Sequence, residues 1–221
     1  LLRQYRMHPL ISAFPNKMFY DGALEDGVDA SDRRGVGLPG GNGVVMWWHI
    51  AHEETVVRSS HSNSAEVDAV CQVVAYLLGK GVEPHDIGVI TPYDAQRALL
   101  LARLRADSPT LAIDSVDAFQ GDEREYIVIS AVRSNQSHTI GFVSDPRRLN
   151  VALTRARRGL VIVGDAVTLS SCKIWRALCD HVASEDYLAL LTGESFERLR
   201  AFSLAGTAVD GPPVVAETDV A

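Results

Sequence analysis

The sequence contains few cysteines, no long apolar run and no phosphate-binding loop. Cys71, Cys172 and Cys179 form an odd set without a CxxC pair, which excludes a disulfide framework and a cysteine-ligated zinc site. We therefore expect a reducing compartment and no metal site built from this chain alone. No apolar segment is long enough to span a membrane, so we expect no membrane partner. The chain also lacks a GxxxxGK(S/T) loop and an acidic pair that closes an apolar strand, so it cannot assemble a complete NTPase site by itself.

Positive charge is also in deficit. The chain has 21 Lys and Arg against 28 Asp and Glu, which gives a net charge of -7 over 221 residues. This balance argues against a general affinity for polyanions, so any nucleic-acid binding needs a local positive track. The length suits one globular domain, and the absence of an initiator Met leads us to expect a piece of a longer protein.

Short β-branched runs alternate with helical patterns through the middle of the chain. This order predicts an α/β fold, in which a mostly parallel β-sheet carries helices on both faces. The segment 206–221 is rich in small residues, Gly and Pro, so we expect a disordered tail there. The predicted helices are 10–20, 64–78, 95–105, 146–155, 174–182 and 196–202, and the predicted strands are 44–50, 87–91, 111–116, 126–132 and 160–164.

Five arginines gather near one predicted helix. Asp145 is a good N-cap and Pro146 suits the first helical position, so we expect the helix to run from there through Arg155. Arg148 and Arg155, seven residues apart, then project from another face than the apolar residues, where their guanidinium forks suit the oxygens of a triphosphate. A solvated, salt-bridged helix face is the alternative. The five are Arg147, Arg148, Arg155, Arg157 and Arg158.

Two further segments suit a nucleotide. Tyr5 and Arg6, in the run Gln4–Pro9, place an aromatic ring beside a permanent charge, which together stack on a base and grip a phosphate. In the second segment, Gly121 permits a tight turn, Gln120 offers a donor and an acceptor, and Glu123 accepts from a ribose hydroxyl. The alternatives are a helix-entry loop with Tyr5 as a core anchor, and a turn followed by a solvated acidic patch.

Two tripeptides follow predicted strands, namely Thr91-Pro92-Tyr93 and Arg133-Ser134-Asn135. Their hydroxyls, aromatic ring and single cation suit a single-stranded nucleic-acid backbone, although ordinary turn chemistry is the better explanation for either tripeptide taken alone. Ligands of open parallel sheets bind beyond the carboxyl ends of the strands. We therefore expect these tripeptides and residues 117–123 at that edge.

Four motifs occur in the order and spacing of a known family, at 4–9, 90–93, 115–123 and 145–157. Together they resemble the second, C-terminal RecA-like domain of a superfamily-one RNA helicase of the up-frameshift type, which acts in nonsense-mediated mRNA decay. The resemblance covers residues 1–205. Senataxin-like and immunoglobulin mu-binding-like helicases, which act on DNA or RNA, are close alternatives, and a non-catalytic nucleic-acid or protein-binding module is another.

The resemblance implies roles for individual residues. Arg155 resembles the arginine finger that senses the γ-phosphate, and Arg6 resembles an arginine that reaches the terminal phosphates. Tyr5 resembles the aromatic residue that packs on the base, while Gln120 and Glu123 resemble a motif that links nucleotide to nucleic acid. The residues that resemble contacts of the RNA track are Thr91, Ser115 and, more weakly, Arg133.

The resemblance also implies cofactors and partners. ATP with Mg²⁺ would bind between this domain and a first RecA-like domain absent from this chain, so we expect the fragment alone to be inactive. Single-stranded RNA, with DNA as the alternative, and decay-factor proteins are the expected partners, and a cytoplasmic location with shuttling to the nucleus is expected. Asp122 stands where family members often carry a basic residue, which predicts weaker anion attraction there.

Overall fold

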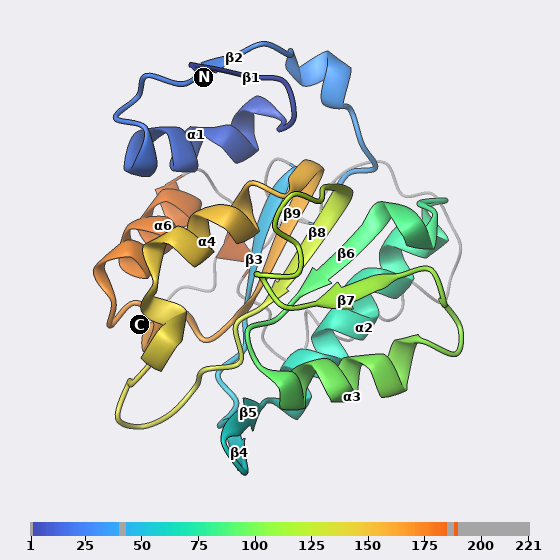
Figure 1. The fold of residues 1–221 in the computed structure, drawn as a ribbon, viewed down its shortest axis with the longest axis vertical. Coiled ribbons are helices and arrows are strands. Elements are labelled where there is room, and N and C mark those ends of the chain that lie inside the picture. The colour runs from blue at the N-terminus through green and yellow to red at the C-terminus, as the bar shows by residue number, and fades with distance from the viewer. Residues whose placement is uncertain (1, 40–42, 185–187, 190–221) are drawn as a thin grey trace, which may run out of the picture.

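A six-stranded parallel sheet forms the centre of the molecule in the computed structural model, which describes residues 2–39, 43–184 and 188–189 (Figure 1). The strand order is β10-β3-β9-β8-β6-β7, and every pair of neighbours is parallel. The predicted α/β class is therefore confirmed. The strands are β3 (Val45–His49), β6 (Ile87–Ile90), β7 (Ala112–Asp114), β8 (Arg124–Ser130), β9 (Ala156–Gly164) and β10 (Leu188–Ala189).

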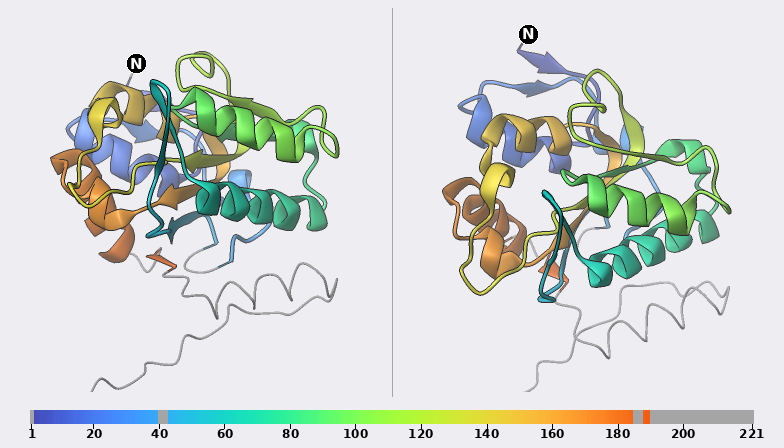
Figure 2. Two further views of the ribbon diagram at one scale, coloured as in Figure 1. Left: turned by 90° about the horizontal axis from the view of Figure 1, so that it is seen from below. Right: turned by 60° about the horizontal axis from the view of Figure 1, so that its bottom comes forward.

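Helices cover both faces of this sheet, as predicted (Figure 2). One face packs against α1 (Pro9–Phe19), α4 (Pro146–Leu153) and α6 (Lys173–Ser184), and the other against α2 (Ser64–Gly79) and α3 (Asp94–Leu104). Successive strand residues point to opposite faces, so Trp47 and Trp48 of β3 enter different cores and are both almost fully buried. The chain adds the short helix α5 (Ala166–Leu169) after β9.

Two small sheets lie at opposite ends of the central sheet (Figure 1). The N-terminal pair β1 (Arg3–Gln4) and β2 (Glu25–Asp26) lies with α1 near the amino ends of β8 and β9, where the backbone N–H of His8 donates to the carbonyl of Arg157 at 2.8 Å. The hairpin of β4 (Thr55–Val57) and β5 (Ser60–Ser62) lies near the carboxyl ends. We call these two ends of the sheet the amino edge and the carboxyl edge.

The predicted arginine helix is wrong at its C-terminal end. Asp145 caps α4 by accepting from the backbone N–H of Arg147, and Pro146 occupies the first turn, as expected. The helix nevertheless stops at Leu153, because the chain from Ala156 pairs with β8 in the central sheet. Of the five arginines, Arg147 and Arg148 lie on α4, Arg155 lies in the turn that follows, and Arg157 and Arg158 lie on β9. Tertiary pairing has overridden the helical pattern here.

The other predicted elements that fall on described residues are present, with ends shifted by a few residues. The helix predicted at 196–202, the tail at 206–221 and the domain boundary at 205 lie outside the described residues. Over the part of the chain that the structure describes, no helix combines the length and apolar character needed to cross a bilayer.

Candidate functional site: an arginine cluster at the amino edge

The residues predicted to bind nucleotide meet at the amino edge of the sheet. Arg6 Nε donates to Glu123 Oε2 at 2.5 Å, and Arg6 Nη1 donates to the carbonyl of Thr154 at 3.0 Å. Arg155 reaches the same turn, since its Nη2 donates to Thr154 Oγ1 at 3.1 Å. The fold thus brings together three side chains that the sequence separates widely.

Arg155 is held in place by its own turn and by the loop before β8. Its Nε donates to the carbonyl of Val151 at 3.0 Å, and its Nη1 donates to the carbonyl of Asp122 at 3.1 Å. Burial, followed by repulsion from Arg6, lowers the pKa of Arg155. The fold therefore keeps two like charges close together, an arrangement that an anion would stabilise.

Arg157 and Arg158 complete this group, which we call the arginine cluster together with Arg6 and Arg155. Both pair with Glu125, at 2.8 Å and 2.6 Å, and Arg157 Nε also lies 3.7 Å from Glu123 Oε1. Three of the four guanidinium groups, those of Arg6, Arg157 and Arg158, thus pair with the carboxylates of Glu123 and Glu125. The four arginines outnumber these two carboxylates, in a chain whose net charge is -7.

Tyr5 presents an exposed ring beside this cluster. The residue is 60% exposed, its ring lies so close to Gly27 that an added Cβ would clash with Tyr5 Cε1, and the Arg3 guanidinium carbon lies 5.8 Å from the ring centroid. Arg33 fixes the backbone of both motif residues, because its Nη2 donates to the carbonyl of Tyr5 at 2.5 Å and its Nε to that of Arg6 at 2.7 Å. The core-anchor interpretation of Tyr5 is therefore wrong.

Gly27 and Arg33 were not candidates from the sequence. Gly27 carries no signal beyond that of a chain breaker, and Arg33 lies in a glycine-rich connection without a motif. Both act on Tyr5 through contacts that only the folded chain creates.

The loop 115–123 connects the two edges. It leaves the carboxyl end of β7, crosses the face of the sheet where Phe119 is buried against it, and enters β8 at the amino edge. Gly121 makes the expected turn with a φ of +92°, and Gln120 is exposed beside it. The expectation that Gln120 and Glu123 lie beyond the carboxyl ends is thus wrong, because the loop returns across the sheet before they occur.

The carboxylate of Asp122 pairs with a neighbouring arginine, which offsets its repulsion of anions. Its carboxylate accepts from Arg124 Nη1 at 2.5 Å, and this hydrogen bond is the main cause of the lowered pKa of Asp122. The backbone carbonyl of Asp122 accepts the hydrogen bond from Arg155 Nη1. The residue that departs from the family pattern therefore helps to hold Arg155.

Thr91, Ser115 and Arg133 lie together at the carboxyl edge, following β6, β7 and β8. Thr91 is 1% exposed, and no partner is described for its Oγ1. The hydroxyl of Ser115 accepts from the backbone N–H of Ala118 at 3.3 Å. Their predicted contact with nucleic acid stays a prediction.

Arg133 is also buried, and its side chain has more described hydrogen-bond partners than those of the other two candidates. It is 7% exposed, its Nε donates to both carboxylate oxygens of Glu54 at 2.9 and 3.0 Å, and its Nη1 donates to the Tyr93 hydroxyl at 3.2 Å. Burial opposes its charge, but these hydrogen bonds raise the pKa of Arg133. Arg133 therefore organises this edge as a structural cation, whatever further contacts it makes.

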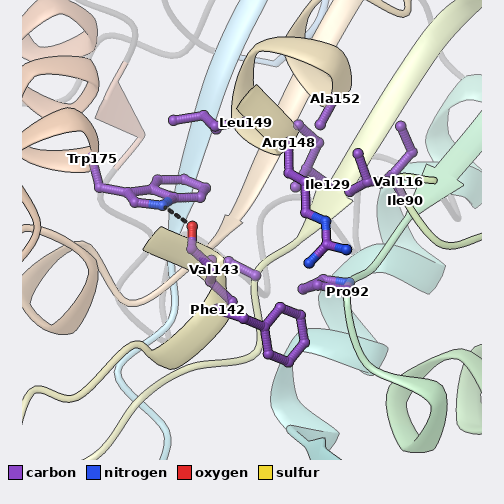
Figure 3. A pocket seen from close by; sticks show the side chains of 11 residues that line it. Ile90, Pro92, Val116, Ile129, Phe142, Val143, Arg148, Leu149, Ala152 and Trp175 are labelled. Carbon is purple, nitrogen blue, oxygen red and sulfur yellow. Dashed lines mark hydrogen bonds between the residues drawn. The ribbon is translucent and has the colours of Figure 1, made fainter. Parts of the chain in front are cut away.

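An apolar pocket of about 30 Å³ lies between β6, β8 and α4 near this edge (Figure 3). Such a volume holds little more than a water molecule. Arg148 lines it beside Phe142 and Pro92, and pairs with Asp117 at 2.9 Å. Arg148 thus does not share a phosphate-facing surface with Arg155, which corrects the prediction that both project from one helix face.

Residues 2–39, 43–184 and 188–189 contain no group of three or more His, Cys, Asp or Glu side chains placed to hold a metal ion. The same residues include Cys71, Cys172 and Cys179, all as free thiols.

Comparison with known proteins places this geometry in a family. The model of the AAA domain family matches residues 1–167. Regulator of nonsense transcripts 1 of Caenorhabditis elegans is 43% identical over 84% of this chain and 18% of its own length, and the ATP-dependent helicase NAM7 of Saccharomyces cerevisiae is 39% identical over 80% and 20%. This chain therefore spans about one fifth of the length of these relatives.

One solved structure shows a more distant likeness. The C-terminal domain of a possible DNA helicase from Lactobacillus plantarun WCFS1 covers 73% of this chain and 88% of its own, with a TM-score of 0.45 and 14% identity. This likeness is too weak to carry a functional argument. The family match over residues 1–167 is decisive: the chain belongs to the AAA domain family, and it is similar to part of regulator of nonsense transcripts 1 and to part of the helicase NAM7.

Proposed function

We propose that this chain is the C-terminal motor domain of an ATP-dependent RNA helicase that acts in nonsense-mediated mRNA decay. It supplies one wall of an ATP site whose other wall is a first RecA-like domain. The observation that carries this proposal is the convergence of Arg6 and Arg155 beside an exposed aromatic ring, in a cluster with excess positive charge. The names of the similar proteins, a regulator of nonsense transcripts and an ATP-dependent helicase, support the same assignment.

Each residue at the amino edge has a chemical task in this proposal. The exposed ring of Tyr5 would stack on the adenine base, displacing the Arg3 guanidinium that lies over it, and Glu123 would accept a hydrogen bond from the ribose. Arg6 exchanges its hydrogen bond with Glu123 for one with a terminal phosphate oxygen. Arg155 would stabilise the charge that develops on the γ-phosphoryl group during transfer to water, and Mg²⁺, if held by a first domain, would supply further neutralisation of that charge.

The loop 115–123 gives the domain a physical link between ATP and nucleic acid. One end, at Glu123, belongs to the arginine cluster, and the other, at Ser115, lies at the carboxyl edge where we place the single strand. Closure of the two domains around ATP would therefore move both ends of one covalent segment. This supports coupling between hydrolysis and stepping along the strand.

The proposal is tested in the full-length protein by RNA-stimulated ATP hydrolysis, with and without Arg155. A paired unwinding assay on RNA and DNA duplexes decides the substrate, because backbone and stacking contacts are common to both nucleic acids and only 2′-hydroxyl contacts separate them. Loss of turnover in R155A together with unwinding of RNA supports the proposal. Wild-type turnover in R155A would refute the arginine-finger assignment.

A further inference from the structure

A buried carboxyl group on α2 contacts the turn that begins the carboxyl-edge segment Arg133–Asn135. Glu66 is fully buried. Its Oε1 and Oε2 accept from the backbone N–H of Val132 at 3.0 and 2.9 Å, and Oε2 also accepts from Ser130 Oγ at 2.7 Å. None of the candidate roles at either edge uses this side chain.

The turn that Glu66 holds is strained. Val132 has a φ of +73°, a region that β-branched residues avoid. The N–H of Arg133 donates to the carbonyl of Ala131 at 2.9 Å, which makes residues 131–133 a γ-turn of the rare positive-φ kind. Such a backbone is strained and persists only where its surroundings enforce it.

The direction of the following segment depends on this turn. Directly after Val132, the backbone N–H of Ser134 donates to Glu54 Oε2 at 2.8 Å, and Ser134 Oγ donates to Asp165 Oδ2 at 2.9 Å. Asn63, the N-cap of α2, donates from Nδ2 to the carbonyl of Val132 at 3.4 Å. Without the turn, the segment could not reach both carboxylates.

We infer that Glu66 is a positioning residue for nucleic-acid binding: it enforces the turn at Val132 and thereby sets the course of Arg133–Asn135 along the carboxyl edge. This inference rests on the proposed function, since it assumes that the single strand lies at that edge. Glu66 itself is too deeply buried to touch the strand. Its effect on binding therefore passes through the backbone of Val132.

The test compares three variants of the full-length protein for binding of a fluorescent single-stranded RNA oligonucleotide by anisotropy. E66A removes the acceptor, and we expect the affinity to fall about tenfold or more. E66Q keeps an oxygen for the Val132 N–H and an amide donor toward Ser130, so it should bind within about twofold of wild type. The double variant E66A/V132G should recover most of the affinity, because glycine adopts positive φ without strain.

The outcomes separate this inference from the proposed function. Wild-type affinity in E66A overturns the inference, and so does a double variant that binds no better than E66A. If E66A does not fold, the double variant decides: folding and binding support the inference, whereas an unfolded or non-binding protein overturns it. If wild type itself does not bind the oligonucleotide, the proposed function fails first.

Discussion

Replacing Arg155 by alanine in the full-length protein would remove the central guanidinium of the arginine cluster. The side chain donates three hydrogen bonds, to the carbonyls of Val151 and Asp122 and to Thr154 Oγ1. At about 1 kcal/mol net each, their loss predicts a decrease of about 2–3 kcal/mol in the free energy of unfolding. The effect on turnover should be larger, because an arginine finger contributes about a thousandfold or more, which is about 4 kcal/mol of activation free energy.

The assay measures steady-state ATP hydrolysis at saturating single-stranded RNA, beside urea unfolding of the same preparations. R147A is the matched control, since Arg147 is an exposed arginine of the same segment that lies on α4 outside the cluster. We expect R147A to keep wild-type turnover. The turnover of R155K should lie between those of R155A and wild type, because lysine retains the positive charge but lacks the planar guanidinium fork. Wild-type turnover in a folded R155A, or an equal loss in R147A, would refute the reasoning.

Three further predictions concern residues that no motif contains, and a fourth concerns the chain alone. R33M removes both hydrogen bonds that fix the carbonyls of Tyr5 and Arg6, so the KM for ATP should rise about tenfold with little change in kcat; an unaltered KM contradicts this. G27A should displace the Tyr5 ring and weaken ATP binding several-fold, whereas G79A, whose Cβ meets nothing within 4 Å, should not; equal affinities would show that the ring is not a stacking surface. Burial raises the pKa of Glu66 from 4.5 to about 8, and the nearby charges of Asp165 and Glu54 act in the same direction, whereas the hydrogen bonds from Ser130 and Val132 oppose the shift. In this pH range the folded protein holds a proton that the unfolded chain releases, so the free energy of unfolding should fall by a few kcal/mol as pH rises from about 4.5 to about 8. In urea melts, E66Q should flatten this pH dependence. Identical pH dependences of the two proteins would exclude the Glu66 carboxyl group as its source. The isolated chain should fold yet bind Mg-ATP weakly, so tight binding by calorimetry would contradict the need for a second wall.

The sequence predicted the fold class and most elements because these depend on local patterns. Continuous β-branched runs such as Ile87–Ile90 identify buried parallel strands, and the Asp145-Pro146 pair marks a helix start through contacts within one turn. The end of the same helix was not predictable, because it depends on Ala156 pairing with Arg124 in a distant strand. The helical spacing of apolar residues continues to Ala156, although the helix ends at Leu153 and β9 begins at Ala156.

The candidate site divides in the same way. The motif residues Tyr5, Arg6, Glu123 and Arg155 were all identified before the structure, since each carries its chemistry in its side chain. Their position at the amino edge could not be predicted. The loop 115–123 leaves the carboxyl end of β7 and crosses the sheet, so Glu123 lies at the opposite edge from the end of the strand that precedes it.

By itself, the sequence determined which chemical groups this protein has and which local structures hold them. Only the tertiary structure decided which groups meet: Arg6 and Glu123 lie 117 positions apart, yet their side chains are hydrogen-bonded at 2.5 Å. It also decided that Gly27 and Arg33 support Tyr5, and that Glu66 of α2 holds a strained turn that follows β8. The physical reason is that these contacts depend on strand order and on the packing of helices over the sheet, which no window of neighbouring residues contains.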